Sequence, residues 1–268
     1  MTFNSILIVG CGNMAGAMLQ GWIAGGLDPA RFIVVNPSPR DLPAGVVQLH
    51  ELPADGAFDA ILLGVKPQKL GSVAPDLERL AGPGTVILSV LAGVELITLA
   101  EYFPRAASVR VMPNLAVALG KSPVALAGGD LDDALRGSVD ALMAPLGTAE
   151  WLEDEGQMGL VTALAGSGPA FVYRFIDALA SGAVSLGLPQ QQADRLALAM
   201  VEGAAALAAS SEHSPGELAR RVASPGGVTQ AGLDILDHDQ ALAHLVEATL
   251  SGARDRSDAM AAEARKQG

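Results

Sequence analysis

Short apolar runs alternate with stretches of helical periodicity along residues 1–152. The runs are apolar throughout instead of alternating with polar residues, which is typical of strands covered on both faces of a sheet. They predict strands at Ser5–Val9, Phe32–Val35, Ala60–Gly64, Thr85–Ser89, Val109–Met112 and Val124–Ala127. Helical spacing between them predicts helices at Met14–Ala24, Lys69–Leu80 and Leu131–Met143. We therefore expect an α/β fold with a Rossmann-type, doubly wound and mainly parallel sheet.

The pattern changes after Trp151, where an acidic stretch leads into a region without strand signals. Helical periodicity predicts four helices, at Pro169–Leu186, at Pro189–Ser211, from near Thr229, and from Gln240 to the C-terminus. We place the boundary between a Rossmann domain, 1–152, and an all-α domain, 153–268. The helices have wide apolar faces rich in small residues. This favours an oligomer, such as a homodimer, over an ordinary core within one chain.

Composition narrows the class further. Hydrophobic residues make up 50% of the 268 residues but aromatic residues only 4%, which suits closely packed helices. With 17 basic and 29 acidic residues, the net charge of −12 argues against a nucleic-acid partner. The one cysteine, Cys11, excludes an internal disulfide and a cysteine-based zinc site, and we expect no metal. No apolar stretch reaches the roughly 18 residues of a membrane span, and no secretory leader is evident, so we expect a soluble, cytoplasmic protein.

The first predicted strand runs directly into a glycine loop, Gly10-Cys11-Gly12-Asn13-Met14-Ala15. In a dinucleotide-binding loop, Gly10 would permit the tight turn, and Gly12 would let the backbone approach the pyrophosphate. Ala15 would let the helix pack on the strand, and the pyrophosphate would lie at the helix N-terminus. The alternative is a glycine-rich turn without a ligand, but the strand before the loop and the helix after it favour a cofactor site. We interpret Cys11 as a small filler residue, that is, a side chain with a structural role and no redox chemistry.

The end of the second strand bears on cofactor choice. NAD-preferring sites usually have Asp or Glu there, whereas this strand ends in Asn36-Pro37-Ser38-Pro39-Arg40. Nothing acidic would repel a 2′-phosphate, and Ser38 and Arg40 could bind it. We therefore predict NADPH, with NADH as the alternative because Asn36 does not exclude it. Arg40 could equally be a solvated charge.

Two further turns follow strands of the predicted sheet, Val65-Lys66-Pro67-Gln68 and Met112-Pro113-Asn114. Ligands of open α/β sheets bind at the carboxyl ends of the strands, where both turns are expected to lie. Lys66 and Asn114 are candidates for contacts with the ribose and nicotinamide of the cofactor. Each turn alone would more often be structural, but their coincidence favours a binding role.

The motif set resembles the pyrroline-5-carboxylate reductase family from Ile6 to about Leu236. It combines the glycine loop and the two turns above with Thr162-Ala163-Leu164-Ala165-Gly166-Ser167-Gly168-Pro169-Ala170-Phe171 and Val222-Ala223-Ser224-Pro225-Gly226-Gly227-Val228-Thr229-Gln230. Phe171, Gly159 and Val228 depart from the family's commoner residues. The resemblance implies reduction of Δ1-pyrroline-5-carboxylate to L-proline by NAD(P)H, the last step of proline biosynthesis. It also implies dimers, often in rings, formed through C-terminal helices that help to bind the substrate.

The Ser224–Gly227 turn precedes a predicted helix. Backbone N–H groups in such a turn can hold an anion, so Ser224, Gly226 and Gly227 are candidates for the substrate carboxylate, with a simple helix cap as the alternative. The resemblance implies that Thr229 hydrogen-bonds the substrate and that Glu212 helps to order the region. A cyclic imine accepts hydride once its nitrogen is protonated, so a strong side-chain acid is unnecessary.

Two other functions remain open from the sequence. A related dehydrogenase acting on a hydroxy acid or another imine would need a Lys or His acid/base near the reacting carbon. A dinucleotide-sensing protein would keep the fold without catalysis.

Overall fold

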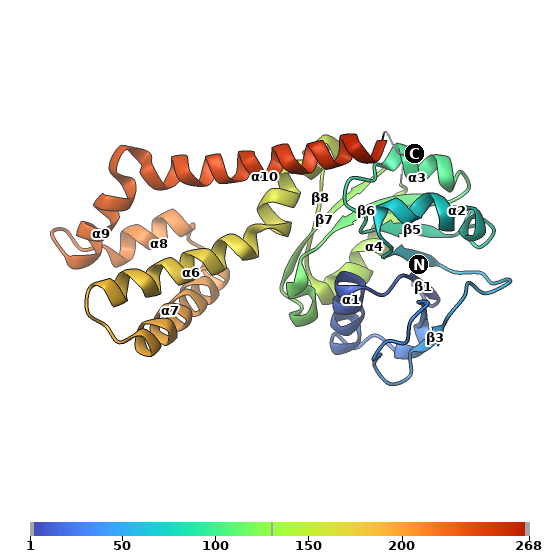
Figure 1. Ribbon diagram of the computed structural model, residues 1–268, viewed down its shortest axis with the longest axis horizontal. Coiled ribbons are helices and arrows are strands. Elements are labelled where there is room, and N and C mark those ends of the chain that lie inside the picture. Colours follow the sequence, from blue (N-terminus) through green and yellow to red (C-terminus); the bar gives the residue numbers. More distant parts are fainter. Residues whose placement is uncertain (1–2, 130, 266–268) are drawn as a thin grey trace. The chain divides into compact units, whose positions relative to one another are not determined.

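The computed structural model describes residues 3–129 and 131–265 (Figure 1). They form two compact units. The first holds the residues up to Ser167 together with those from Gly252 onward, and the second is Gly168–Ser251. This division does not coincide with the boundary expected at residues 152 and 153, because segment 153–167 belongs to the first unit by its contacts. The boundary of the functional domains stays a prediction.

The first unit contains one sheet that, among the described residues, has eight strands in the order β3-β2-β1-β4-β5-β6-β7-β8. Strands β1 to β6 all pair in parallel with one another. Strand β7 pairs antiparallel with β6 and parallel with β8. The strands are β1 Ile6–Val9, β2 Phe32–Val35, β3 Val47–Leu49, β4 Ala60–Leu63, β5 Val86–Ser89, β6 Ala107–Met112, β7 Ser122–Gly128 and β8 Gly147–Trp151. The chain winds outward in both directions from β1 and β4, and this reversal is where ligands of such sheets bind.

Helices cover both faces of the sheet. Along β1, Ile6 and Ile8 belong to one buried cluster with residues of α1 and α4, and Leu7 and Val9 belong to a second cluster with residues of α2 and α3. On the first face the ring of Trp22 stacks on Phe32 at 5.4 Å, and its indole N–H donates to the Leu142 carbonyl. The helices are α1 Asn13–Ala24, α2 Leu70–Glu78, α3 Leu96–Tyr102, α4 Asp133–Met143 and α5 Met158–Val161.

The predicted fold class is confirmed, and all six predicted strands are present with ends shifted by at most two residues. Among the described strands, the one antiparallel pairing of this mainly parallel sheet is between β6 and β7, which returns after the short turn Leu115–Leu119. Strands β3 and β8 and helices α3 and α5 were not predicted, because each has seven residues or fewer and is too short to show a regular apolar pattern. Single helical turns lie at Pro29–Arg31, Pro67–Lys69, Leu115–Leu119, Ala144–Leu146, Glu155–Gln157 and His238–Gln240, and a π-helical turn at Thr162–Gly166.

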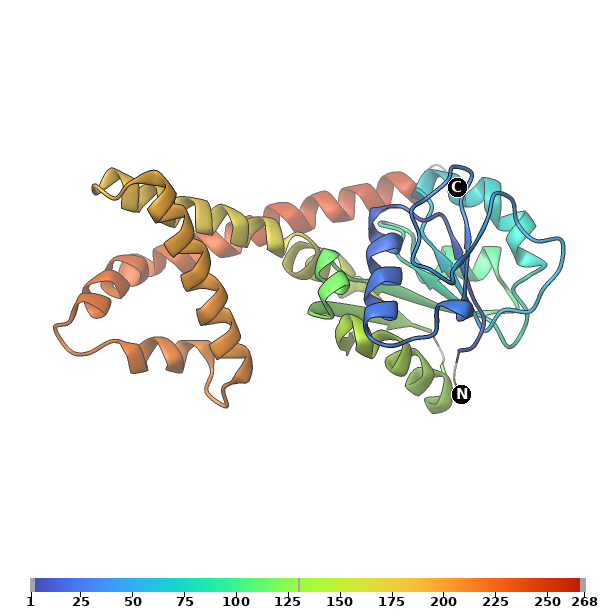
Figure 2. The same ribbon diagram turned by 90° about the horizontal axis from the view of Figure 1, so that it is seen from below.

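The second unit is helical. Its helices are α6 Gly168–Ser185, α7 Gln190–Ser210, α8 Pro215–Val222, α9 Val228–Asp237 and the first part of α10 Ala241–Arg265. Helices α6 and α7 form a hairpin (Figure 2). Gly187, with a φ of +110°, lies in the connection between them. The hairpin buries only a small alanine-rich cluster, Ala180, Ala193 and Ala197. Helix α8 was not predicted, because its eight residues include two arginines and a glutamate.

Much apolar surface of the second unit is left open. Leu186 is 91% exposed, Val228 94% and Ile235 75%, and many other large apolar side chains of these helices are exposed as well. A single chain of this size seldom leaves so much apolar surface in water unless it packs against a partner. Within the part of the chain that the structure describes, no helix combines the length and apolar character needed to cross a membrane.

Candidate functional site

The glycine loop lies at the point where the strand order reverses. Gly10 has a φ of +84°, and its N–H donates to the Val35 carbonyl at the end of β2. A Cβ on Gly10 would lie 2.8 Å from the backbone nitrogen of Val65, which follows β4. The loop after β1 therefore packs directly against the ends of β2 and β4, and a side chain at position 10 would prevent this.

Gly12 and the N-terminus of α1 face open space. Gly12 precedes the first residue of α1, and among the described residues no side chain caps this helix end. A Cβ built on Gly12 would have no described atom within 4 Å. The first N–H groups of the helix are thus available, and the helix dipole favours an anion there. The described residues fit a dinucleotide pyrophosphate at this place, as the sequence predicts for Gly10, Gly12, Asn13, Met14 and Ala15.

Asn36 connects this loop to the next one. Its Oδ1 accepts from the Cys11 N–H at 3.1 Å, and its Nδ2 donates to the Ser38 carbonyl at 2.7 Å. The side chain is buried, whereas Ser38 and Arg40 are exposed. The structure therefore places the carboxamide of Asn36 on the protein's own backbone and leaves Ser38 and Arg40 free to meet a ligand. Direct contact of these three residues with the cofactor stays a prediction.

A cleft of about 370 Å³ separates the glycine loop and the start of α1 from the segment that begins at Arg40. Gly12, Asn13 and Gly16 line one side, and Arg40 and Asp41 line the other. Burial raises the pKa of the Cys11 thiol, and the positive charge of Arg40 offsets part of that rise. The guanidinium therefore acts on the glycine loop, where a cofactor phosphate would lie. Cys11 is 4% exposed, which agrees with its interpretation as a filler residue.

The two later turns differ from each other. Val65 is half-buried, and Lys66 is exposed and precedes the helical turn Pro67–Lys69. Asn114 is buried: its Oδ1 accepts from the Ala116 N–H at 2.9 Å, and its Nδ2 donates to the Ala165 carbonyl at 2.9 Å. Lys66 is therefore free to reach a ligand, whereas Asn114 joins the end of β6 to the π-helical turn. Both remain candidates for cofactor contacts.

The segment that leads into α5 is held by an ion pair that was not predicted from the sequence. Glu155, just before α5, accepts from Arg110 Nη1 at 2.7 Å and from the Leu96 N–H at 2.8 Å with the same Oε1 atom. Arg110 lies in β6, and its side chain is only 9% exposed. An arginine within an otherwise apolar strand is the signal that could have revealed this pair, because a buried charge needs a partner.

The Ser224–Gly227 turn leads into α9 in the second unit. Gly226 has a φ of +72°, and the Gly227 N–H donates to the Ser224 carbonyl at 2.9 Å. A Cβ on Gly227 would collide with Ser224 Oγ and lie 3.0 Å from its carbonyl oxygen. Since the Gly227 N–H is used within the turn, the groups directed outward are those of the first helical turn, including Thr229, which is exposed. Among the described side chains none caps this helix end.

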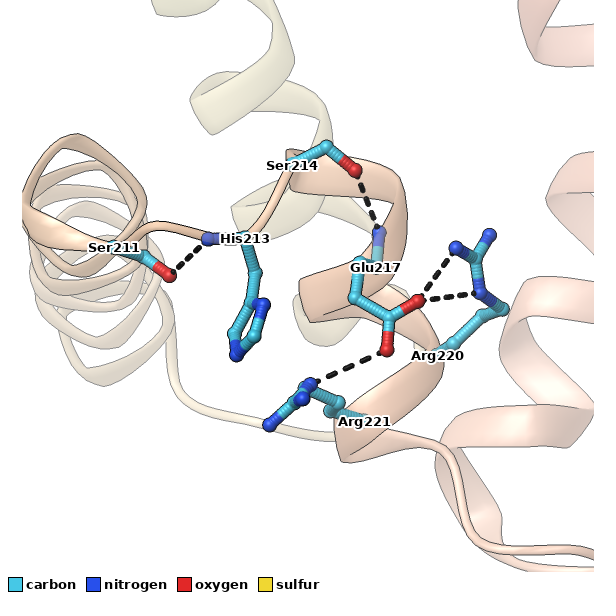
Figure 3. Close-up of polar contacts among 6 residues, drawn as sticks. All are labelled: Ser211, His213, Ser214, Glu217, Arg220 and Arg221. Atoms are coloured by element: carbon cyan, nitrogen blue, oxygen red, sulfur yellow. Dashed lines mark hydrogen bonds and ion pairs between the residues drawn. The ribbon is translucent and has the colours of Figure 1, made fainter.

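Glu212 is exposed in the connection between α7 and α8, and its role stays a prediction. A second carboxylate of this region, Glu217, pairs with Arg220 at 2.6 Å and with Arg221 at 3.2 Å (Figure 3). The Ser214 hydroxyl accepts from the Glu217 N–H and caps α8. The hydrogen bond from Arg220, followed by that from Arg221, holds the pKa of Glu217 below its ordinary value. The Ser-x-x-Glu spacing is a helix-start signal that could have predicted α8.

Comparisons with known proteins agree with this arrangement. Residues 155–260 match the family model for pyrroline-5-carboxylate reductase dimerisation, and residues 5–93 match a model for NADP oxidoreductase, coenzyme F420-dependent. The pyrroline-5-carboxylate reductase of Pseudomonas aeruginosa is 35% identical over 270 residues, which cover 97% of this chain and 98% of that one.

Solved structures agree as well. A pyrroline-5-carboxylate reductase from Coxiella burnetii superposes with a TM-score of 0.87 at 28% identity, over 96% of this chain and 98% of that chain. The Plasmodium falciparum pyrroline carboxylate reductase, solved with NADP bound, has the same fold, with a TM-score of 0.81 at 23% identity over 97% of this chain and 100% of that chain.

Fold and site thus define an oxidoreductase with a Rossmann domain, and the prediction of this class is confirmed. The match of residues 5–93 to an NADP oxidoreductase model supports the predicted cofactor. The chain belongs to the pyrroline-5-carboxylate reductase family. The C-terminal helices fall almost entirely within the match to that family's dimerisation domain, which supports the predicted oligomer.

Proposed function

We propose that this protein reduces Δ1-pyrroline-5-carboxylate to L-proline with NADPH. The observation that carries the proposal is that α1 and α9, the helices behind the two glycine-containing motifs, each directly follow a glycine and have no side-chain cap among the described residues. The N-terminus of α1 suits the pyrophosphate of a dinucleotide. That of α9 suits a small carboxylate. A reductase of a carboxylated imine needs both.

The cofactor half of the proposal rests on the loop after β2. No carboxylate stands at the end of this strand, and the guanidinium of Arg40 lies at the cleft beside the glycine loop. We assign Ser38 and Arg40 to the 2′-phosphate, and Lys66 to the phosphate or ribose nearer the nicotinamide. Asn36 and Asn114 support these contacts by fixing the loops after β2 and β6. NADPH is therefore preferred over NADH.

The substrate half rests on α9. The substrate carboxylate accepts from the N–H groups of the first turn of α9, supported by the positive end of the helix dipole. Ser224 adds a hydroxyl donor, and Gly226 and Gly227 give the turn its shape. The Thr229 hydroxyl, one residue into the helix, hydrogen-bonds the ring of the substrate beside the nitrogen.

For this reaction the protein mainly needs to position the imine and the cofactor. When bound, NADPH supplies a hydride to the carbon of the protonated C=N bond, and the product is the secondary amine of proline and NADP⁺. A cyclic imine takes up its proton from water near neutral pH, so the residues of the chain hold the iminium and do not need to protonate it. Orientation of the imine carbon toward the nicotinamide supplies the remaining rate enhancement.

The test is to titrate the purified protein with Δ1-pyrroline-5-carboxylate while following the absorbance of NADPH. We expect NADPH consumption that saturates with the imine and yields proline, and a smaller rate with NADH. Oxidation only with 2-oxo acids would favour the related dehydrogenase. Tight binding of NADPH without turnover of any imine would favour the sensor.

Assembly and location complete the proposal. We infer a homodimer through the exposed apolar faces of α6, α7, α9 and α10, with rings of dimers as the larger alternative. Sedimentation at micromolar concentrations distinguishes them. Location in the cytoplasm and the absence of nucleic-acid and membrane partners stay predictions from composition.

A further inference from the structure

Both the oxygen and the NH₂ group of the Gln48 side chain, on β3, form hydrogen bonds with the loop after β2. Its Oε1 accepts from the Arg40 N–H at 3.0 Å. Its Nε2 donates to the Ser38 carbonyl at 2.9 Å and to the Asn36 carbonyl at 3.2 Å. The partners fix the orientation of the amide, because two carbonyls face its NH₂ group and an N–H faces its oxygen.

The loop needs these donors from outside. Residues 36–40 include Pro37 and Pro39, which have no N–H, so the loop has few donors for its own carbonyls. The Ser38 carbonyl accepts from both Gln48 and Asn36. A single half-buried side chain on the edge strand therefore bonds to three backbone groups of the loop, one each from Asn36, Ser38 and Arg40.

We propose that Gln48 is a specificity-determining positioning residue that holds Ser38 and Arg40 where they bind the 2′-phosphate of NADPH. This inference rests on the cofactor assignment of the proposed function. Gln48 acts through the loop: both of its N–H donors are already used on carbonyls, so neither is left for the phosphate. Fixing the backbone N–H of Arg40 fixes the origin of the guanidinium that lines the cleft.

The test uses two small ligands that differ only in the phosphate in question. Calorimetry with the full-length protein gives the affinities of 2′,5′-ADP and 5′-AMP without any turnover. For Gln48→Met, which keeps the length and removes all three hydrogen bonds, we expect 2′,5′-ADP to bind about tenfold more weakly, because charge-assisted contacts depend on geometry. The affinity for 5′-AMP should change by less than about twofold, since that ligand does not use the loop's phosphate contacts.

A second variant and a control distinguish a specific effect from misfolding. Gln48→Asn keeps the amide but shortens it by one methylene, and it should lose the same discrimination. Gln190→Met, an exposed glutamine of the second unit, is the matched control and should change neither affinity. An unchanged ratio of the two affinities in both Gln48 variants would overturn the inference. An equal loss for both ligands would also overturn it, because that result indicates a merely structural role.

Arg40→Ala separates this inference from the proposal on which it rests. If Arg40→Ala lowers the ratio of the affinities for 2′,5′-ADP and 5′-AMP and the Gln48 variants do not, the cofactor site is supported and the role of Gln48 is contradicted. If no variant changes discrimination, the assignment of the 2′-phosphate site fails and the role of Gln48 fails with it. Failure to reduce the imine would contradict the proposed reaction, and the two ligand affinities would still decide the role of Gln48.

Discussion

The side-chain oxygen of Asn36 accepts a hydrogen bond from the backbone N–H of Cys11 at 3.1 Å. The end of β2 is thereby joined to the glycine loop, 25 residues earlier in the chain. The two segments that would hold the adenosine end of a dinucleotide are therefore fixed relative to each other by one buried amide.

Replacing Asn36 by Asp tests the placement of the ribose site. The carboxylate still accepts from Cys11 but no longer donates to the Ser38 carbonyl, and its charge repels a 2′-phosphate. We expect the ratio of kcat/KM for NADPH over NADH to fall about tenfold, which corresponds to about 1.4 kcal/mol. Steady-state kinetics with both cofactors measure it. Asn36→Ser, which adds no charge, is the control, and an unchanged ratio in Asn36→Asp would mean that the 2′-phosphate lies elsewhere.

Two glycines of the same loop should respond in opposite ways. Gly10→Ala puts a Cβ 2.8 Å from the Val65 nitrogen at a φ of +84°, so we expect it to destabilise the protein by about 2 kcal/mol. Gly12→Ala meets open space at a φ of −80°, so its stability should change by less than about 0.5 kcal/mol. The methyl group added in Gly12→Ala should instead weaken NADPH binding. Urea unfolding and cofactor titration separate the two effects, and equal stabilities would contradict the close packing at Gly10.

The sequence predicts the sheet well because its strands are buried on both faces and therefore read as uninterrupted apolar runs. It also predicts the glycine loop, because that loop needs glycine at fixed spacing. What it does not reveal are contacts between residues far apart in the chain, such as Arg110 with Glu155. Strand β3, which carries Gln48, is three residues long and lies at the sheet edge, so its pattern is too short to predict. A sequence motif also does not show whether a polar residue such as Asn114 faces a ligand or the protein's own backbone.

The Arg110–Glu155 pair should contribute to stability far more than an exposed pair. Glu155→Ala leaves Arg110 in β6 without its carboxylate partner, and we expect a loss of about 2–3 kcal/mol, because that arginine is nearly buried. Glu263→Ala removes the partner of Arg256, where both side chains are at least 60% exposed, and should cost less than about 1 kcal/mol. Urea midpoints of the two variants provide the comparison. Similar losses would show that burial does not distinguish the two pairs.

Cys11 should be a slow nucleophile at neutral pH. Burial raises its pKa, so the thiol is protonated at pH 7 and the thiolate forms at a higher pH than in an ordinary cysteine. We expect iodoacetamide to label the native protein much more slowly than the same protein in urea, with a rate that rises as the pH becomes alkaline. Mass spectrometry of the alkylated protein gives both rates. Fast labelling of the native protein at pH 7 would contradict the filler interpretation.

Thr229 is the residue on which turnover should depend most. It lies one residue into α9, after the Ser224–Gly227 turn, and its side chain is exposed. Thr229→Ala removes the hydroxyl but keeps the helix, so kcat with Δ1-pyrroline-5-carboxylate should fall about 10- to 100-fold, because the hydrogen bond that orients the iminium for hydride transfer is lost. The affinity for NADPH should stay nearly the same, because the cofactor loop belongs to the other unit. Thr229→Ser retains the hydroxyl and should recover most of the rate. If turnover of Thr229→Ala equalled that of the unmodified protein, the substrate would lie away from this helix and the carboxylate site at α9 would have to be reassigned.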